Sequence, residues 1–528
     1  MLRTQLYADP ANLFLHDLVL ESCKRHFAKT ALVDPSAPRR LTYAEYGERV
    51  ESCAGGLVAA GLRPGDVAAI FLPNSWEFCV VYHAVTLAGA IPTLLNPTYR
   101  EREVHYQVSN SGAVFMISDG VQLDGVSLAS LPCLRRVFYT RQPAPGAEPF
   151  SNLLTHRSFA LPRPALSSDR ALAALPYSSG TTGLPKGVML SHRNLVANVY
   201  QIIAPNAAQL SHDDTILCFL PLYHIYGLNV ILNPALILGA TLVLMPRFNV
   251  EQLTHLITDE SVTMMPLVPP AMNALCLAAE AGQFPRVHKV RWVKSGAAPL
   301  APDLPRRFTS LTGILVCQGY GMTEASPVTH LGFLQPELYH PESIGHPVAE
   351  TECRVLTSSE SSTEAPTGEP GELVMRGPQV MLGYWNEPQA TESVLRDGFY
   401  WSGDVVTRDA EGFYRVVDRR KEMIKYKGFP VAPAEVEAVL LEHPAVREAG
   451  VVGCPDPAAG EIPVAFVALR EGFSSGDKLA GELCAFVAER LTSYKQPRQV
   501  RFIPSVPKTA SGKILRRELR LKLEPTPP

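Results

Sequence analysis

The sequence lacks the features that direct a protein to a membrane, to secretion or to nucleic acid. Its formal net charge is only -3 over 528 residues, so it has no basic excess for nucleic acid or for an anionic lipid surface. The N-terminus has no continuous apolar segment of the signal-peptide kind. The most apolar stretch, 230–246, is broken by Asn233 and Pro234, which favours buried core over a membrane span.

Cysteine patterns typical of metal and redox sites are also missing. The ten cysteines are scattered from Cys23 to Cys484, with no C-x-x-C pair and no Cys/His cluster at zinc spacing. We therefore expect neither a zinc site nor a disulfide framework, and a reducing cytoplasm is the predicted location. The last residues do not form a peroxisomal address.

The length predicts more than one domain, because 528 residues exceed what one hydrophobic core normally supports. Amphipathic helical patterns alternate with short apolar strands such as VAAIFLP, which predicts an α/β fold with parallel, helix-covered sheets. We expect a large N-terminal domain at 1–417, with a small β-barrel-like subdomain at about 345–417. A hinge at 418–421 and a small, mobile α+β domain at 422–528 would follow. Prolines between Thr140 and Asp169 predict a long irregular connection.

A stretch rich in glycine and hydroxyl side chains follows that connection. Residues 177–192 read YSSGTTGLPKGVMLSH. Glycines let backbone N–H groups approach an anion, hydroxyls donate hydrogen bonds, and Lys186 adds a mobile positive charge, so the composition suits a phosphate. It is not a Walker A loop, because Lys186 lies between Pro185 and Gly187.

Taken alone, such a cluster of small residues is typical of a flexible surface turn. The whole stretch, however, resembles the signature loop of the adenylate-forming superfamily, and the resemblance continues in order over nearly the whole chain. It is closest to the fatty acyl-CoA synthetase, 4-coumarate-CoA ligase and luciferase-like branches. The resemblance implies that Thr182 takes part in catalysis and that the loop binds ATP through Ser178, Ser179, Gly180, Thr181, Thr182 and Lys186.

Two further motifs gain a nucleotide-binding role from this resemblance. QGYGMTE places an aromatic ring between glycines, where it can lie against adenine, and Glu324 is expected to hold Mg²⁺ together with substrate phosphates. Asp404, in YWSGDVV, would accept the ribose hydroxyls, although an aspartate in such a turn usually caps the backbone. The other implied nucleotide contacts are Gln318, Gly319, Tyr320, Thr323, Arg419 and Lys421.

The segments LPLYHIYGLN and KSGAAPL are expected to border the acid. On its own, His224 would be interpreted as a core histidine and KSGAAPL as a tight turn. The resemblance implies instead that His224 lies beside the reacting carboxylate. The implied acyl-pocket residues are Tyr226, Val230, Ala297, Gly319 and Leu331.

Two lysine-bearing loops fall in the C-terminal domain. Such charge runs usually form a solvated face, but the superfamily uses these loops in alternate half-reactions. Lys513 would stabilise the α-phosphate during adenylation, and Lys425 would serve the thiol step after a rotation about Lys421. The implied coenzyme A contacts are Arg247, Lys427 and Gly428.

The predicted activity is an ATP-dependent carboxylic acid:CoA ligase that uses Mg²⁺. Val230 and Leu331 make the predicted pocket more apolar than in 4-coumarate ligases, so a medium- or long-chain fatty acid is the first expectation and an aryl-propenoic acid the second. Alternatives are an acyl-AMP ligase that loads a separate carrier protein, luciferase-like oxidation and a silent binding protein. The silent protein ranks low because the residues needed for chemistry are all present, namely Lys186, Glu324, Asp404 and Lys513. A homodimer stays open, and neither a nucleic-acid partner nor a transmembrane segment is expected.

Overall fold

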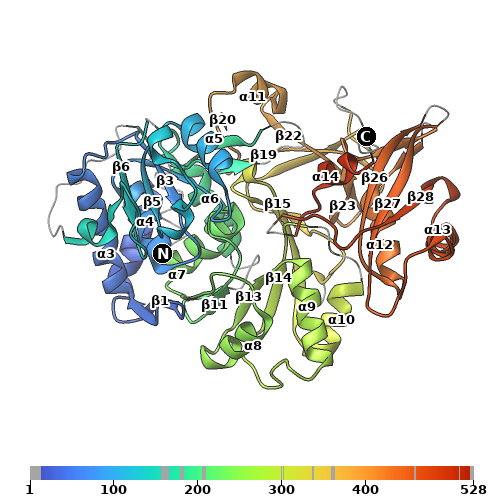
Figure 1. Ribbon diagram of the computed structural model, residues 1–528, viewed down its shortest axis with the longest axis horizontal. Helices are drawn as coiled ribbons and strands as arrows, with labels where there is room; N and C mark the ends of the chain where they lie inside the picture. Colours follow the sequence, from blue (N-terminus) through green and yellow to red (C-terminus); the bar gives the residue numbers. More distant parts are fainter. Residues whose placement is uncertain are drawn as a thin grey trace.

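The computed structural model describes residues 13–523 except 132, 156–165, 179–183, 205–209, 299, 301–302, 336–337, 358–362, 428, 457–458 and 510–511. It contains a large N-terminal domain with parallel sheets and a smaller C-terminal domain, which lies to the right in Figure 1. The predicted α/β class is thereby confirmed. The boundary at 418–421 stays a prediction.

A nine-stranded sheet forms the centre of the N-terminal domain. In spatial order its strands are β17 (His346–Pro347), β16 (Val328–Leu331), β15 (Leu315–Gly321), β14 (Trp292–Ser295), β13 (Met264–Leu267), β11 (Thr215–Cys218), β12 (Thr241–Leu244), β1 (Thr30–Asp34) and β2 (Arg39–Thr42). The strands from β15 to β1 pair in parallel, and antiparallel strands extend both edges. Since ligand-binding loops follow the carboxyl ends of parallel strands, β14 and β15 deliver their loops to one edge.

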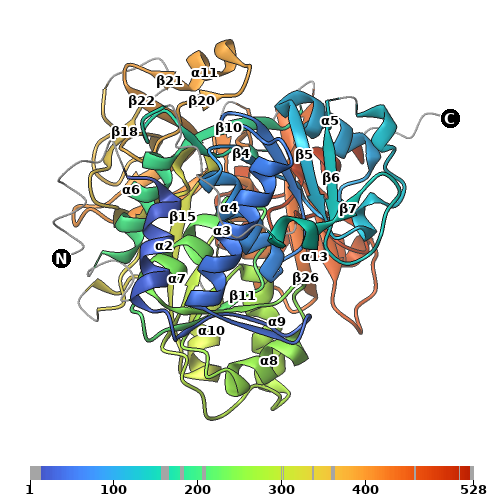
Figure 2. The same ribbon diagram turned by 90° about the vertical axis from the view of Figure 1, so that its left-hand side faces the viewer.

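A second sheet is parallel throughout. Its strands are β4 (Ile91–Leu94), β3 (Val67–Phe71), β5 (Ala113–Ser118), β6 (Arg136–Tyr139) and β7 (Glu148–Pro149). Helix α4 (Trp76–Leu87) contacts strands of both parallel sheets and packs against α3 (Tyr43–Ala59), as Figure 2 shows. This position explains why α4 is buried around almost its whole circumference.

The connection that we predicted to be irregular is partly ordered. Strand β7 completes the second sheet, and a 3₁₀ helix, η4 (Phe150–Thr155), packs on α3. The prolines prevented a periodic pattern, but two residues suffice to pair with β6. The other helices of this domain are α2 (Leu15–Arg25), α5 (Glu101–Ser111), α6 (His192–Ile203), α7 (Asn233–Leu238), α8 (Val250–Asp259), α9 (Pro269–Glu280), α10 (Asp303–Thr312) and α11 (Pro388–Val394).

Two antiparallel sheets complete the N-terminal domain. One contains β20 (Gly383–Tyr384), β10 (Lys186–Ser191), β8 (Leu172–Ala174) and β9 (Tyr177–Ser178). The other lies in the predicted β-rich segment and contains β18 (Glu352–Leu356), β19 (Gly371–Arg376), β22 (Phe399–Arg408), β21 (Leu395–Arg396) and β23 (Tyr414–Arg419).

The C-terminal domain has a sheet and a core of its own. The sheet contains β25 (Phe429–Val431), β24 (Ile424–Tyr426), β27 (Gly460–Leu469), β26 (Val446–Asp456) and β28 (Gln499–Phe502). The helices are α12 (Pro433–Glu442), α13 (Asp477–Arg490) and α14 (Arg516–Leu521). Val436, Val451 and Leu483 belong to a hydrophobic cluster confined to this domain.

The most apolar stretch of the sequence is buried, as predicted. It forms part of a π-helical turn, η5 (Gly227–Leu232), then α7 and β12. Over the ranges that the structure describes, no helix combines the length and the apolar character required to cross a membrane.

Candidate active site

Charged side chains from both domains meet beside the loops that follow β14 and β15. The ammonium group of Lys513, from the C-terminal domain, interacts electrostatically with Arg419, Asp404 and Glu324. Burial and the positive charge of Arg419 lower the pKa of Lys513 to about 8, against the opposing effect of the carboxylates of Asp404, Glu324 and Glu422. Lys513 therefore lies among predicted nucleotide-binding residues of the N-terminal domain.

The hairpin that carries Lys513 rests on helix α9. A β-carbon added at Gly512 would come within 2.8 Å of the Pro270 side chain, and Gly512 has a φ of +84°. Thr509 braces the turn, since its backbone N–H donates to the Lys513 carbonyl at 2.8 Å. A glycine before the lysine thus permits both the left-handed turn and the close approach to α9.

Asp404 is held by an aromatic hydroxyl and a guanidinium. The Tyr320 hydroxyl donates to Oδ2 of Asp404 at 2.5 Å, and Nε of Arg419 lies 3.2 Å from Oδ1. Asp404 and Arg419 are direct cross-strand partners on β22 and β23. Burial and the neighbouring Asp404 raise the pKa of the Tyr320 hydroxyl well above its usual value. The structure therefore brings these three predicted nucleotide contacts together.

Glu324 lies in a short 3₁₀ helix, η6 (Thr323–Ala325), and is only 7% exposed. The Tyr384 hydroxyl donates to Oε1 of Glu324 at 3.0 Å, and Nζ of Lys186 lies 5.3 Å from the centre of the Tyr384 ring. Tyr384 thus connects Glu324 with the base of the phosphate loop. Our sequence reasoning missed this tyrosine, because only the pairing of β20 with β10 brings it there.

Magnesium chemistry is compatible with this arrangement. In the part of the chain that the structure describes, no three His, Cys, Asp or Glu side chains cluster to hold a metal by themselves. Mg²⁺ commonly binds one or two carboxylates together with substrate phosphates, and Glu324 supplies one carboxylate near Lys186. The residues present therefore fit a metal that is delivered with a nucleotide.

The predicted phosphate loop joins the ends of an antiparallel hairpin. Lys186 on β10 pairs with Ser178 on β9, so both ends of the loop are fixed. Trp385 and Leu175 pack so closely around Gly187 that a β-carbon there would lie 3.2 Å from each. The predicted residues Ser179, Gly180, Thr181, Thr182 and Gly428 lie outside the described residues.

His224 stands at the start of the predicted acyl pocket. Its Nδ1 accepts a hydrogen bond from the Tyr226 backbone N–H at 3.2 Å. Burial and the nearby Lys513 lower the pKa of His224 to about 4, so the ring is neutral at pH 7. His224 therefore lies near Lys513, and its place next to the reacting carboxylate stays a prediction.

The predicted pocket residues Tyr226, Gly319 and Leu331 do come together. A β-carbon at Gly319 would lie 3.3 Å from Cδ2 of Leu331, and one at Gly296 would lie 3.2 Å from the Tyr226 ring. The Tyr226 hydroxyl donates to the Lys294 carbonyl at 3.2 Å. Glycines at 296 and 319 therefore keep this space free of side chains.

The remaining predicted pocket and nucleotide residues have varied surroundings. Val230 is buried in η5, while Ala297 is exposed with a φ of 69°, an uncommon conformation for alanine. The side-chain amide of Gln318 donates to the Pro341 carbonyl at 2.7 Å. Thr323 begins η6, one residue before Glu324.

The predicted coenzyme A contacts Arg247 and Lys427 are exposed. The predicted nucleotide contact Lys421 and the predicted catalytic Lys425 also lie at the surface. The backbone N–H of Lys425 donates to Glu461 at 2.8 Å within the C-terminal domain. The structure thus presents Lys513, and not Lys425, to the nucleotide residues.

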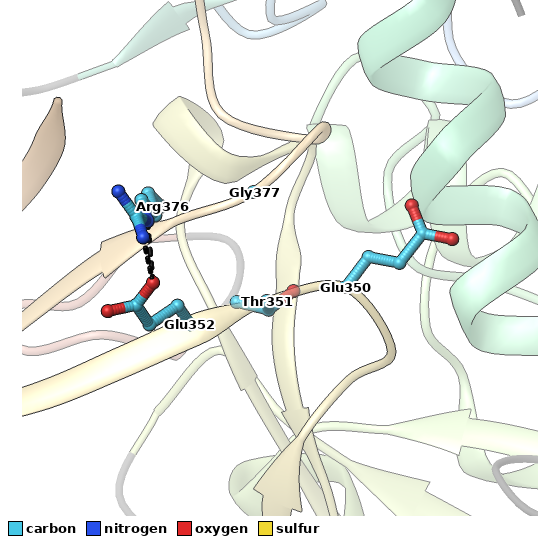
Figure 3. Close-up of a pocket in the computed structure, with 5 residues that line it drawn as sticks. All are labelled: Glu350, Thr351, Glu352, Arg376 and Gly377. Atoms are coloured by element: carbon cyan, nitrogen blue, oxygen red, sulfur yellow. Dashed lines mark hydrogen bonds and ion pairs between the residues drawn. The ribbon is translucent and has the colours of Figure 1, made fainter.

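A surface hollow of about 540 Å³ lies at a different place, between β18 and β19. Figure 3 shows Arg376 and Glu352 on its wall, and this guanidinium comes within 2.6 Å of Oε2 of Glu352. Glu352 also pairs with Arg354 at 2.7 Å. Both guanidinium groups pair with Glu352, and none of the predicted site residues lines the hollow.

Comparison with known proteins agrees with this arrangement of domains. The family model described as AMP-binding enzyme matches residues 19–385, and that of the AMP-binding enzyme C-terminal domain matches residues 435–513. The chain is 38% identical over 525 residues to 4-coumarate–CoA ligase 5 from Oryza sativa subsp. japonica. This alignment covers 98% of the chain and 96% of the relative.

Solved structures show the same architecture. An anthranilate CoA ligase, AuaEII, in complex with anthranoyl-AMP superposes with a TM-score of 0.88 at 26% identity, covering 97% of each chain. The o-succinylbenzoate CoA synthetase from Bacillus subtilis, in complex with ATP and magnesium, gives a TM-score of 0.82 at 30% identity. That match covers 95% of this chain and 98% of the other.

Proposed function

Because the chain belongs to the AMP-binding enzyme family and is an AMP-forming acid:CoA ligase, we propose that its acid is an aryl-propenoic acid of the 4-coumarate type. The support is the 38% identity to a 4-coumarate–CoA ligase along almost the entire length of both chains. This proposal reverses the order expected from the sequence alone, where a fatty acid came first.

The proposed mechanism rests on the position of Lys513 near Glu324, Asp404 and Arg419. A lysine beside a carboxylate that can hold Mg²⁺ and a carboxylate that can hold a ribose is suited to the α-phosphate of ATP. We therefore assign this arrangement to the adenylation step.

In that step, an oxygen of the substrate carboxylate attacks the α-phosphorus of ATP, and the bond to pyrophosphate breaks. Lys513 offsets the negative charge that builds on the phosphoryl oxygens, as a positioned cation does in related transfers. Mg²⁺, when bound at Glu324, would neutralise phosphate charge. Neutral His224 would orient the substrate carboxylate by donating a hydrogen bond to it. Because the ring carries no charge, it would not form an ion pair that holds the carboxylate back from the α-phosphorus.

In the second step, the thiol of coenzyme A attacks the acyl carbon, and AMP leaves. We propose that the C-terminal domain rotates about Lys421, which withdraws Lys513 and brings Lys425, Lys427 and Gly428 to the site. Arg247 would contact the phosphates of coenzyme A. The exposure of Arg247, Lys425 and Lys427 leaves them free for such contacts.

A fatty acid is the second candidate for the substrate. Val230 and Leu331 are 2% and 3% exposed and supply apolar surface to the region of the pocket. A long alkyl chain would gain about 0.8 kcal/mol for each methylene buried there.

The experiment is pyrophosphate release by the purified protein with ATP and Mg²⁺ over a panel of cinnamates, benzoates and fatty acids, with and without coenzyme A. We expect 4-coumarate to give the highest kcat/KM, at least about tenfold above decanoate or palmitate, with acyl-CoA as the product. An equal or higher kcat/KM for a fatty acid would overturn the aryl-propenoic assignment. Pyrophosphate release without formation of any acyl-CoA would indicate that a carrier protein, and not coenzyme A, accepts the acyl group.

A further inference from the structure

A buried tyrosine hydroxyl occupies one of the two oxygens of the carboxylate that we assign to Mg²⁺. Tyr384 donates to Oε1 of Glu324 at 3.0 Å, and the two residues are only 9% and 7% exposed. In the part of the chain that the structure describes, no hydrogen bond from a side chain reaches the other oxygen, Oε2. Oε2 is therefore the oxygen that is left for a cation.

Three separate elements determine the position of the Tyr384 hydroxyl. Tyr384 pairs with Val188 where β20 joins β10, and its backbone N–H donates to Oγ1 of Thr391 in α11 at 2.9 Å. Tyr400 on β22 contributes a side-chain hydrogen bond to the Tyr384 oxygen. The hydroxyl that donates to Glu324 is thus itself held in place.

The segment around Tyr384 also holds the backbone of Glu324. The Met381 N–H donates to the Glu324 carbonyl at 2.8 Å, and the Trp385 N–H donates to the Gly187 carbonyl at 2.8 Å. A buried tyrosine hydroxyl needs some acceptor, but a main-chain carbonyl would serve for that purpose. A segment that bonds both the backbone and one carboxylate oxygen of Glu324 fixes the rotation of the carboxylate relative to the phosphate loop.

The number of free carboxylate oxygens matters for the choice of metal. The two oxygens of one carboxylate lie too close together for neighbouring corners of the octahedron that Mg²⁺ requires, whereas Ca²⁺ accepts both of them. A hydrogen bond that occupies one oxygen leaves a site with a single carboxylate oxygen. Such a site suits Mg²⁺, and it withholds from Ca²⁺ a ligand that this larger ion can use.

We propose that Tyr384 is a positioning residue that restricts Glu324 to metal binding through a single oxygen, and that it thereby makes the site select Mg²⁺ over Ca²⁺. The inference rests on the proposed function, since it concerns the metal–ATP complex that the same site accepts. Tyr400 contributes indirectly, because it fixes the hydroxyl of Tyr384.

The test measures ATP binding in the absence of any acid, so that no turnover occurs. Calorimetric titration gives the Kd of ATP for the full-length protein in saturating Mg²⁺, in saturating Ca²⁺ and in EDTA. The wild-type protein should bind ATP more tightly with Mg²⁺ than with Ca²⁺. In Tyr384→Phe, the ratio of the Ca²⁺ to the Mg²⁺ Kd should fall at least about tenfold, since partners of ligating carboxylates typically change metal affinity by this amount. The Kd in EDTA should stay within a few-fold.

Two further variants separate positioning from a general loss of packing. Tyr400→Phe should lower the same ratio a few-fold, and Tyr384→Phe/Tyr400→Phe should lower it no further than Tyr384→Phe alone, because Tyr400 acts through Tyr384. Tyr43→Phe is the matched control. It removes a fully buried hydroxyl that donates to the Ala240 carbonyl at 2.7 Å, and it should leave all three Kd values unchanged.

An unchanged ratio in Tyr384→Phe would overturn the inference. Equal weakening of ATP binding in all three solutions would also overturn it, because a displaced nucleotide site has that effect. If Tyr384→Phe does not fold, the ratio in Tyr400→Phe decides: a decrease supports the inference and no change refutes it. A wild-type protein that binds ATP equally well with either metal would refute it as well. Failure of the proposed acid class is seen only in the panel of acids and leaves these Kd values untouched.

Discussion

At the scale of single residues, the site brings together charged side chains from distant parts of the chain. Asp404 accepts a hydrogen bond from the Tyr320 hydroxyl and forms an ion pair with Arg419, so its carboxylate is fixed before any nucleotide arrives. Lys513 differs from them in that it reaches these groups from another domain. Its protonation should therefore be visible in the kinetics of the first step.

The rate of adenylation should fall at alkaline pH. The pKa of Lys513 is about 8, so the lysine is charged below that pH and loses its charge above it. With cinnamate, which has no group titrating in this range, kcat/KM for ATP should decrease about tenfold for each pH unit above 8, because kcat/KM reports groups of the free enzyme. Pyrophosphate release measured from pH 6 to 10 gives the profile.

Lys513→Arg provides the comparison for this profile, because a guanidinium stays charged throughout the range. Its activity should be lower at neutral pH, but the alkaline decrease should vanish. An identical decrease in both proteins would assign the titration to another group. His224 cannot be that group, since its pKa of about 4 lies far below the range.

Sequence reasoning found most of the charged residues of the site, but it missed Tyr384 and the burial of Lys294, which both depend on strand pairing. Glu324, Asp404 and Lys513 stand in motifs whose order along the chain could be recognised directly. Lys294 is the first residue of the motif KSGAAPL, yet nothing in that motif indicates that its ammonium group is buried. Its burial follows from the position of β14 between β13 and β15, which a sequence does not specify.

At the scale of elements, the apolar pattern predicted the strands well and their arrangement poorly. VAAIFLP and PVAFVAL became β3 and β27, and the helical pattern after Pro433 became α12. Strand order depends on contacts between distant segments, so β1 could not be placed beside β12 from local periodicity. The π-helical turn η5 was also not foreseen, because its residues read as a helix of ordinary period.

Gly227 is required for the path of that turn. A β-carbon at this residue would lie 2.2 Å from the Pro221 carbonyl oxygen, so Gly227→Ala must displace the backbone that positions His224 and Tyr226. We expect a loss of about 1–3 kcal/mol in the free energy of unfolding, together with a lower kcat/KM for every acid. Denaturant unfolding and pyrophosphate release measure the two effects.

Gly481→Ala is the matched control. Gly481 lies within α13, is exposed, and has no atom within 4 Å of an added β-carbon. The same substitution there should increase stability by about 0.5–1 kcal/mol and leave activity unchanged, because alanine favours the helix. If Gly227→Ala behaved like this control, the steric argument for η5 would be refuted.

At the scale of the whole molecule, the segment between the domains is bonded on both sides. Arg420 pairs with Glu372 of β19 at 2.8 Å, and its backbone N–H donates to Gly403. Asp418 accepts the Ala434 backbone N–H at 2.8 Å, at the first turn of α12. A rotation about Lys421 would leave the Arg420 contacts in place but would have to release the bond between Asp418 and Ala434, so we expect two discrete arrangements of the domains.

Substitutions in the two lysine-bearing loops should impair opposite half-reactions. Lys513→Ala should reduce acyl-adenylate formation about 10²- to 10³-fold, yet leave the conversion of supplied acyl-AMP to acyl-CoA nearly intact. Lys425→Ala should do the reverse. Pyrophosphate release without coenzyme A measures the first step, and acyl-CoA formation from synthetic acyl-AMP measures the second.

Two further lysines control for the loss of charge alone. Lys508 lies on the same hairpin as Lys513 but pairs with Glu448 at 3.1 Å, and Lys478 is exposed on α13. Their alanine variants should carry out both steps normally. If Lys513→Ala impaired both steps equally, Lys513 would act in a single fixed arrangement of the two domains. The contacts of Arg420 and Asp418 would then hold the domains rigidly together. Opposite losses instead require that the domain leaves the position seen here during each catalytic cycle, since Lys425 is exposed while Lys513 occupies the site.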